Sequence, residues 1–324
     1  MHPVWEWLPA IYLFLGGLGS GAFLVAATFE FAGKRYEFDF SPTTLVGATV
    51  PGPLVALGTV LLIFDLGAGL REPWRIFLMF THPTSVMTWG VWILTFFIPL
   101  SFVYGFLELM DVYPGAWERM KNRASARRLP FVQQLPIRRT KRIVAAVGSA
   151  FAVGTALYTG ILLSAVGPAI PLWSTPILPF IPVSMMPILF LISAVSTGVG
   201  LTVDLSGTLF VRDMQHRIPQ LPLIHLALIG AETLLLGMLL ITAFANGGAA
   251  SQAALDIVIG PHSLVFWLLI VLPGFIFPFV VHAYAVGLGG HSAFSGLGSG
   301  VGIIVAGLFL RYLILISGLP AALL

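Results

Sequence analysis

The sequence contains no cysteine among its 324 residues, and charged residues make up only 9% of it. Without cysteine, the protein cannot form disulfides, attach c-type haem, hold an iron–sulfur cluster through thiolates or use a thiolate nucleophile. Charged residues are also too few to solubilise a domain of this length, because 58% of the residues are hydrophobic. Any redox chemistry must therefore use a bound cofactor, a mobile carrier or a partner protein.

The first residues lack the basic segment of a cleavable signal peptide, so we expect an uncleaved first span. Eight apolar stretches follow, and each is long enough for a membrane span, which takes about 20 residues. They cover residues 9–32, 43–64, 86–110, 143–166, 183–205, 222–245, 262–287 and 298–318. The sequence therefore predicts an all-α polytopic membrane protein, with about eight spans in two four-helix bundles and a single membrane domain over 1–324.

Lysine and arginine are distributed unevenly between the two sides of the membrane. If the loops alternate, 13 of these residues lie on the side opposite the N-terminus, nine of them in the basic loop 111–142. The N-terminal side receives only Arg71 and Arg75, while Arg311 lies within the last span. The positive-inside rule makes the basic side cytoplasmic, so both termini are expected on the periplasmic side of a bacterial or archaeal inner membrane.

Ionisable side chains inside spans are costly, so each is a functional candidate. Asp204, His225 and Glu232 form a possible track from the cytoplasmic side to the midplane, and such groups suit proton relay. The alternative is a buried ion pair, for example between Glu232 and Arg311, that holds the bundles together. The residues alone leave both interpretations open.

A second set of polar and aromatic residues is expected near the outer side. Its members are Tyr12, Asp65, Arg71, Arg75, His82, Tyr158 and Trp173. Asp65 is a candidate ligand, but a salt bridge to Arg71 or Arg75 explains an acid at a helix end equally well. The short segment 72–82 is too short to span and is expected to form an interfacial helix.

Haem requires a direct test, because membrane bundles often hold it between two histidines. His225 and His282 are predicted at similar depth, toward the cytoplasmic side, so a single haem between them is conceivable. The other histidines lie in loops or at interfaces, and no second pair exists near the outer side. We predict neither haem nor a metal site in this protein.

Several outer-side motifs together resemble the NrfD/PsrC family, the membrane subunits of polysulfide-reductase-type complexes. They are YLFLGGLGSGAFL at 12–24, IFDLGAGLREPWRIF at 63–77, PTSVMTWGVWIL at 83–94, YTGILLS at 158–164, PLWST at 171–175 and LRYLILISG at 310–318. Each motif alone is weak, but their joint order and spacing cover essentially the whole sequence.

The resemblance implies a haem-free subunit that binds a quinone, with menaquinone favoured. It also implies that the partner is a periplasmic iron–sulfur subunit of the four-cluster type. Through that subunit the protein would serve a molybdopterin or multihaem catalytic subunit, as part of a complex of anaerobic respiration. Tyr158 matches the family's quinone-binding tyrosine and Asp65 its second-span aspartate, while Glu232 resembles an acid implicated in proton conduction. The polar first-span residues of the polysulfide reductase branch are replaced by small residues such as Gly16, so Tyr12 and Gly16 become the expected first-span contacts.

The resulting hypothesis is quinol oxidation, or the reverse reaction, without a cofactor resident in this subunit. Tyr158, with Asp65 or His82, would orient the quinol hydroxyls and accept their protons, a positioned acid–base role. Trp173, Arg71 and Arg75 would line the site, and protons would leave outward or follow Glu232, Asp204 and His225. The alternatives are a proton-coupled secondary transporter and a passive anchor for a redox complex. Lipid is an expected partner and nucleic acid is not.

Overall fold

The computed structural model describes residues 7–36, 41–65, 77–78, 80–122, 136–178, 181–205, 221–288 and 293–318. These residues contain eight helical segments that are long and apolar enough to cross a membrane, as the sequence predicts. In sequence order the spans are built from α1 (Trp7–Tyr36), α2 (Ser41–Thr49) with α3 (Pro51–Asp65), α5 (Val86–Val112), α9 (Ile137–Ser164), α10 (Met186–Val199) with the π-helix η3 (Gly200–Leu205), α13 (Leu221–Asn246), the π-helix η4 (Val265–Ile276) with α15 (Phe277–Leu288), and α16 (Ala293–Ile316).

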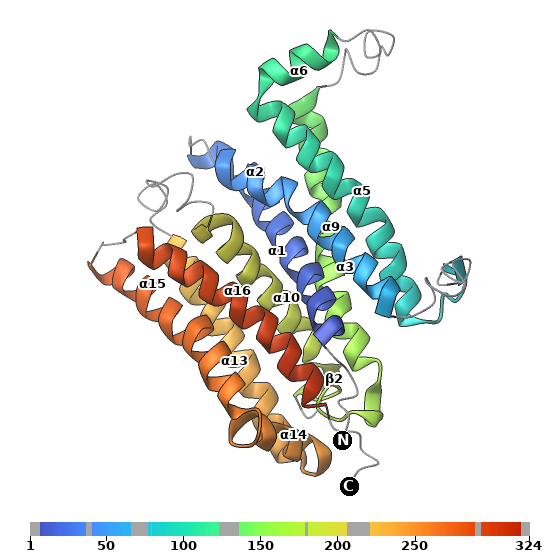
Figure 1. The fold of residues 1–324 in the computed structure, drawn as a ribbon, viewed down its shortest axis with the longest axis vertical. Helices are drawn as coiled ribbons and strands as arrows, with labels where there is room; N and C mark the ends of the chain where they lie inside the picture. The colour runs from blue at the N-terminus through green and yellow to red at the C-terminus, as the bar shows by residue number, and fades with distance from the viewer. Residues whose placement is uncertain are drawn as a thin grey trace.

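The helices run up and down, and the two ends of the bundle are named here by residues that mark them (Figure 1). The Trp7 end holds the start of α1 and the end of α16, where the rings of Trp7 and Tyr312 stack with centroids 3.7 Å apart. The Lys141 end holds the end of α5 and the start of α9, together with the short helix α6 (Pro114–Lys121). Because the described spans are even in number, the start of α1 and the end of α16 lie at the same end of the bundle.

Helices α1 and α10 form the centre of the molecule and pack closely along their length. A Cβ atom at Gly21 would overlap the backbone of Ala194, and one at Gly198 would overlap the backbone of Gly21. Small residues at such positions let two membrane helices approach until their backbones touch. The glycine-rich first span thus serves packing here.

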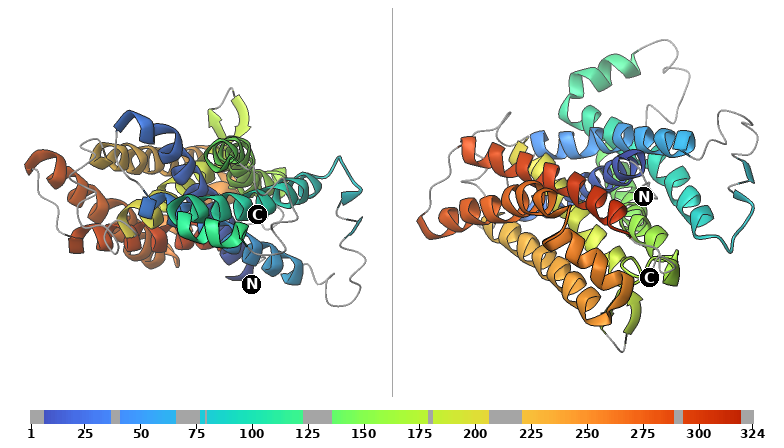
Figure 2. Two further views of the ribbon diagram at one scale, coloured as in Figure 1. Left: turned by 90° about the horizontal axis from the view of Figure 1, so that it is seen from above. Right: turned by 60° about the horizontal axis from the view of Figure 1, so that its bottom comes forward.

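The remaining helices are arranged on either side of this central pair (Figure 2). Helices α3 and α9 pack against α1, with α5 on their outer side, and α13 and α16 pack against α10, with η4 and α15 on their outer side. The two groups correspond to the predicted four-helix bundles, but they share apolar contacts through α1, α10 and α16.

The basic loop is shorter than the predicted 111–142, because helices extend into it from both sides. Helix α5 runs to Val112, α6 follows immediately, and α9 begins at Ile137. The first turns of α9 therefore include Lys141, whose side chain is buried against acidic residues. Because these charges are paired, α9 begins with polar residues, before the point at which hydropathy alone would start the helix.

Three further elements were not expected from the sequence. A small antiparallel hairpin joins β1 (Pro176–Leu178) to β2 (Ile181–Ser184), and a 3₁₀ turn, η2 (Gly167–Ala169), precedes it. Helix α14 (Gly248–Val258) packs its alanine face against α13. Most of the predicted interfacial helix 72–82 lies outside the described residues, although Phe77 and Leu78 follow as an exposed turn.

Candidate functional site at the Trp7 end

Two tyrosines from different helices meet at a cavity near the Trp7 end. Tyr12 on α1 and Tyr158 on α9 both line it, and both side chains are buried. Its walls are otherwise apolar or hydroxyl-bearing and come from α1, α3, α5 and α9. The lining residues are Tyr12, Leu13, Gly16, Val55, Gly58, Thr59, Leu62, Leu94, Thr155, Tyr158, Thr159 and Leu162. The open space is about 30 Å³, so an aromatic headgroup would have to displace side chains such as Leu62 to enter.

Asp65 joins this site through Tyr12. Asp65 is the last residue of α3, exposed at the Trp7 end, and its carboxylate lies beside the Tyr12 hydroxyl, close enough to interact with it. Tyr158 lies close enough to Tyr12 for the two phenols to interact electrostatically. The structure therefore places a surface carboxylate beside the first of two buried phenols.

The ring of Tyr158 is fixed in place by the neighbouring helix α5. A Cβ atom at Gly90 would overlap the Tyr158 ring, so only glycine leaves room for it. Gly16 lines the cavity as well, and a Cβ atom there would lie 3.9 Å from Cγ2 of Thr159, an ordinary contact. Gly90 was not singled out from the sequence, although it lies within the motif that contributed to the resemblance.

Other predicted site residues do not reach this cavity. His82 is exposed before α5, where its Nδ1 atom lies 2.9 Å from Oγ1 of Thr81. Arg71 and Arg75 lie outside the described residues. The role of His82 as a base beside Tyr158 thus lacks the geometry it needs, because its side chain turns toward its own backbone segment.

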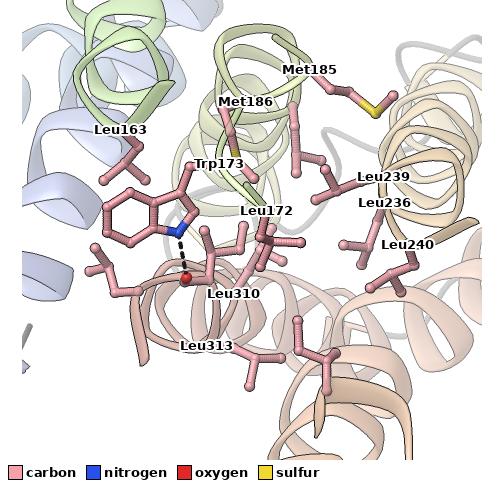
Figure 3. Close-up of a cluster of buried hydrophobic side chains, with 14 of the residues drawn as sticks. Leu163, Leu172, Trp173, Met185, Met186, Leu236, Leu239, Leu240, Leu310 and Leu313 are labelled. Atoms are coloured by element: carbon pink, nitrogen blue, oxygen red, sulfur yellow. Dashed lines mark hydrogen bonds between the residues drawn. The ribbon is translucent and has the colours of Figure 1, made fainter. Parts of the chain in front are cut away.

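Trp173 is also separate from the cavity. It is fully buried in an apolar cluster that includes Leu163, Met186 and Leu310, and its indole N–H donates to the carbonyl of Ile314 at 2.8 Å (Figure 3). Gly318 permits the close approach of this indole to α16. Trp173 therefore joins the connection after α9 to the end of α16, and it does not line the Tyr12–Tyr158 cavity.

The predicted proton track is divided into two clusters. Glu232, on α13, lies beside the hydroxyls of Ser193 and Ser196 of α10. Ser193 also accepts a hydrogen bond from Nη1 of Arg311 at 3.2 Å. Within the described residues, Glu232 and Arg311 thus meet through a serine and not as a direct ion pair. Arg311 is fully buried between the rings of Phe14 and Phe190.

The second cluster lies toward the Lys141 end. His225 and Asp204 form an ion pair with Nε2 and Oδ1 3.1 Å apart, and the ring of His282 stacks on His225 with centroids 4.1 Å apart. His225 is seven residues before Glu232 on α13, so the two share a helix face but lie about 10 Å apart along it. The stacked arrangement leaves no space for a porphyrin between the two rings.

A third buried polar cluster was missed from the sequence. Nζ of Lys141 lies 2.8 Å from Glu30, 2.8 Å from Glu108 and 2.6 Å from Asp111. Arg138 and Arg142 complete it by pairing with Asp111 and Glu30. The sequence contained a signal for this cluster: acidic residues near the ends of α1 and α5 are at the same membrane depth as the basic residues at the start of α9.

Comparison with known proteins agrees with these features. The family model described as "Polysulphide reductase, NrfD" matches residues 1–321. The protein belongs to this family. It is 31% identical to the C subunit of polysulfide reductase from Wolinella succinogenes, over 97% of the present sequence and 94% of that protein. It is also 27% identical to an NrfD homolog of Haemophilus influenzae, over 87% of the present sequence and 84% of that protein.

Membership of the NrfD family and the eight apolar helices together identify a multi-pass membrane protein. The match spans both groups of helices, so the Tyr158 cavity and the two clusters around Glu232 and Asp204 all lie inside the family region. The resemblance drawn from the sequence motifs is thereby confirmed.

Proposed function

We propose that this protein is the quinone-reactive membrane subunit of a polysulfide-reductase-type complex. The supporting observation is that Tyr12 and Tyr158 line one cavity at the Trp7 end, with Asp65 beside Tyr12 at the exposed end of α3. Two phenol hydroxyls and a carboxylate suit a quinol headgroup, whose two hydroxyls must be oriented and deprotonated. The apolar walls suit its ring and tail.

In this proposal the quinol gives up two electrons and two protons. Tyr158 hydrogen-bonds one quinol oxygen, and Tyr12 passes a proton toward Asp65 at the exposed helix end. The electrons leave to an iron–sulfur subunit docked at the Trp7 end, and from there reach a catalytic subunit. Support for a partner comes from the Wolinella relative, whose name makes it one component of polysulfide reductase. The same contacts run in reverse would reduce quinone, with menaquinone as the favoured substrate.

We place the Trp7 end on the periplasmic side of the inner membrane, because the basic residues gather at the other end. Protons released near Asp65 would then leave to the outside. Glu232, with the hydroxyls of Ser193 and Ser196, supplies a proton-binding group at the centre of the bundle if the reaction is coupled to proton translocation.

The test is quinol-analogue oxidation by the purified complex carrying Tyr158→Phe. We expect kcat/KM to fall by roughly 10²-fold or more, the lower range for loss of a positioned acid–base group. Tyr104→Phe is the matched control, because Tyr104 is equally buried in the same group of helices, and Phe23 and Phe97 surround its ring. Full activity of Tyr158→Phe would favour a passive anchor, and a protein that purifies alone without quinol activity would favour a transporter.

A further inference from the structure

Asp204, His225 and His282 bring one carboxylate and two imidazoles together inside the bundle at the Lys141 end. One potential ligand atom from each residue lies within 4.8 Å of the other two, and all three side chains are buried. They come from three different segments, η3, α13 and α15. A buried set of two imidazoles and one carboxylate is a donor set used by divalent transition metals, zinc in particular.

The hydrogen bonds around the two histidines select the nitrogens that face the cluster. Nδ1 of His225 donates to the carbonyl of Leu221 at 2.9 Å, which leaves Nε2 directed at Asp204. Nε2 of His282 lies 3.0 Å from Oγ of Ser299. In the tautomer whose Nε2–H donates to this hydroxyl, Nδ1 of His282 carries no proton and can ligate a metal. Outer hydrogen bonds that fix the tautomer in this way are typical of histidines that hold a metal.

The backbone around Asp204 places its side chain in the interior of the bundle. Asp204 lies in the π-helical turn η3, and such turns are rare and frequently lie at functional sites. On α16, a Cβ atom at Gly300 would come within 2.8 Å of Cβ of Asp204, so glycine makes room for the aspartate. Helix α16 thus provides both this space and the hydroxyl of Ser299.

We propose that Asp204, His225 and His282 bind a divalent transition metal ion of the zinc class, with a water as fourth ligand. Zinc bonds of about 2.0–2.1 Å in a tetrahedron place ligand atoms about 3.4 Å apart. The Asp204–His225 separation of 3.1 Å already matches this spacing. Since the ligand atoms lie within 4.8 Å of one another, the widest pair closes by at most about 1.4 Å on binding, a change within reach of side-chain rotation. The metal gives Asp204 and His225 a structural role in place of the predicted proton relay.

The experiment measures metal in the whole complex purified from its native membranes without chelator. We expect one equivalent of zinc-class metal per copy of this subunit, lost in Asp204→Asn, His225→Gln and His282→Gln. His262→Gln is the matched control, because His262 lies at the opposite end of the bundle and should leave the metal content unchanged. The readout is elemental analysis, so it is independent of quinol oxidation.

A second measurement covers ligand variants that fail to fold. Chelator-treated wild-type complex is titrated with Co²⁺, which reports a tetrahedral nitrogen and oxygen site by its visible ligand-field bands. Ser299→Ala keeps all three ligands and should weaken Co²⁺ binding by roughly 10–100-fold. Wild-type complex with neither bound metal nor Co²⁺ bands would overturn the proposal and leave an Asp204–His225 ion pair. Equal metal content in wild type and the ligand variants would overturn it as well.

Discussion

The ring of Tyr158 lies against the backbone of Gly90, and no side chain larger than hydrogen fits between them. This contact joins α9 to α5 at the cavity that also contains Tyr12. It fixes the position of the phenol without a hydrogen bond, because the ring cannot move toward α5 and the cavity is narrow on its other side.

Gly90→Ala should therefore displace Tyr158 without removing any polar group from the site. We expect quinol-analogue oxidation to fall by roughly 10²-fold, since a misplacement of about 1 Å costs that much when reacting groups must be aligned. Gly237→Ala is the control, because a Cβ atom there meets nothing within 4 Å. Similar activities of the two alanine variants would show that the position of Tyr158 does not matter.

Tyr12 and Asp65 should behave as one unit. Tyr12→Phe removes the phenol hydroxyl and Asp65→Asn removes the negative charge of the same interaction, so we expect each to lower kcat/KM by roughly tenfold. The double variant should be little worse than either single variant, because the second change removes an interaction already lost. Steady-state kinetics of the four proteins test this. Multiplicative losses would mean that the two residues act separately.

The sequence predicted the fold well, because hydropathy alone identifies spans of this length. Tyr158 and Asp65 came from motif resemblance, and the structure joins them through Tyr12. The sequence does not reveal the direction in which a side chain points. His82 and Trp173 lie at the predicted depth, but His82 contacts Thr81 and Trp173 contacts Ile314. The track of Asp204, His225 and Glu232 divided because His225 and Glu232 lie two helical turns apart, while the π-turn and Gly300 place Asp204 beside His225.

The Lys141 cluster was missed for a different reason. Charges beside an apolar stretch were interpreted as loop residues that orient the protein. Pairing of Lys141 with three acids lets α9 begin six residues earlier than predicted. Such pairs between α1, α5 and α9 depend on which helices are neighbours in space, and hydropathy carries no information about that.

Variants in the Glu232–Ser193–Arg311 cluster can show whether Glu232 serves the stability of the protein or proton transfer. Arg311→Met leaves the Glu232 carboxylate buried without its cation, so we expect a loss of about 3–5 kcal/mol of stability. Combining it with Glu232→Gln removes both charges and should restore most of that loss, as in other buried pairs. Thermal unfolding in detergent measures the rescue for the single and double variants.

Activity of the same double variant then decides the role of Glu232. A stable Arg311→Met/Glu232→Gln protein with normal quinol oxidation but no proton translocation in proteoliposomes would assign Glu232 to the proton route. Retained proton translocation would instead leave the pair as a purely structural contact between α13 and α16.

Lys141→Met should be among the most destabilising single changes at the Lys141 end. It removes the cation shared by Glu30, Glu108 and Asp111, of which Glu108 is as deeply buried as the lysine. Loss of one partner from a buried ionic cluster costs about 3–5 kcal/mol, and Arg138 and Arg142 reach only Asp111 and Glu30. We expect a lower unfolding temperature in detergent. The affinity of the folded protein for a quinol analogue should stay unchanged. Arg139→Met, an exposed neighbour, should show no such drop; equal unfolding temperatures for both variants would mean that water, and not Lys141, balances the three acids.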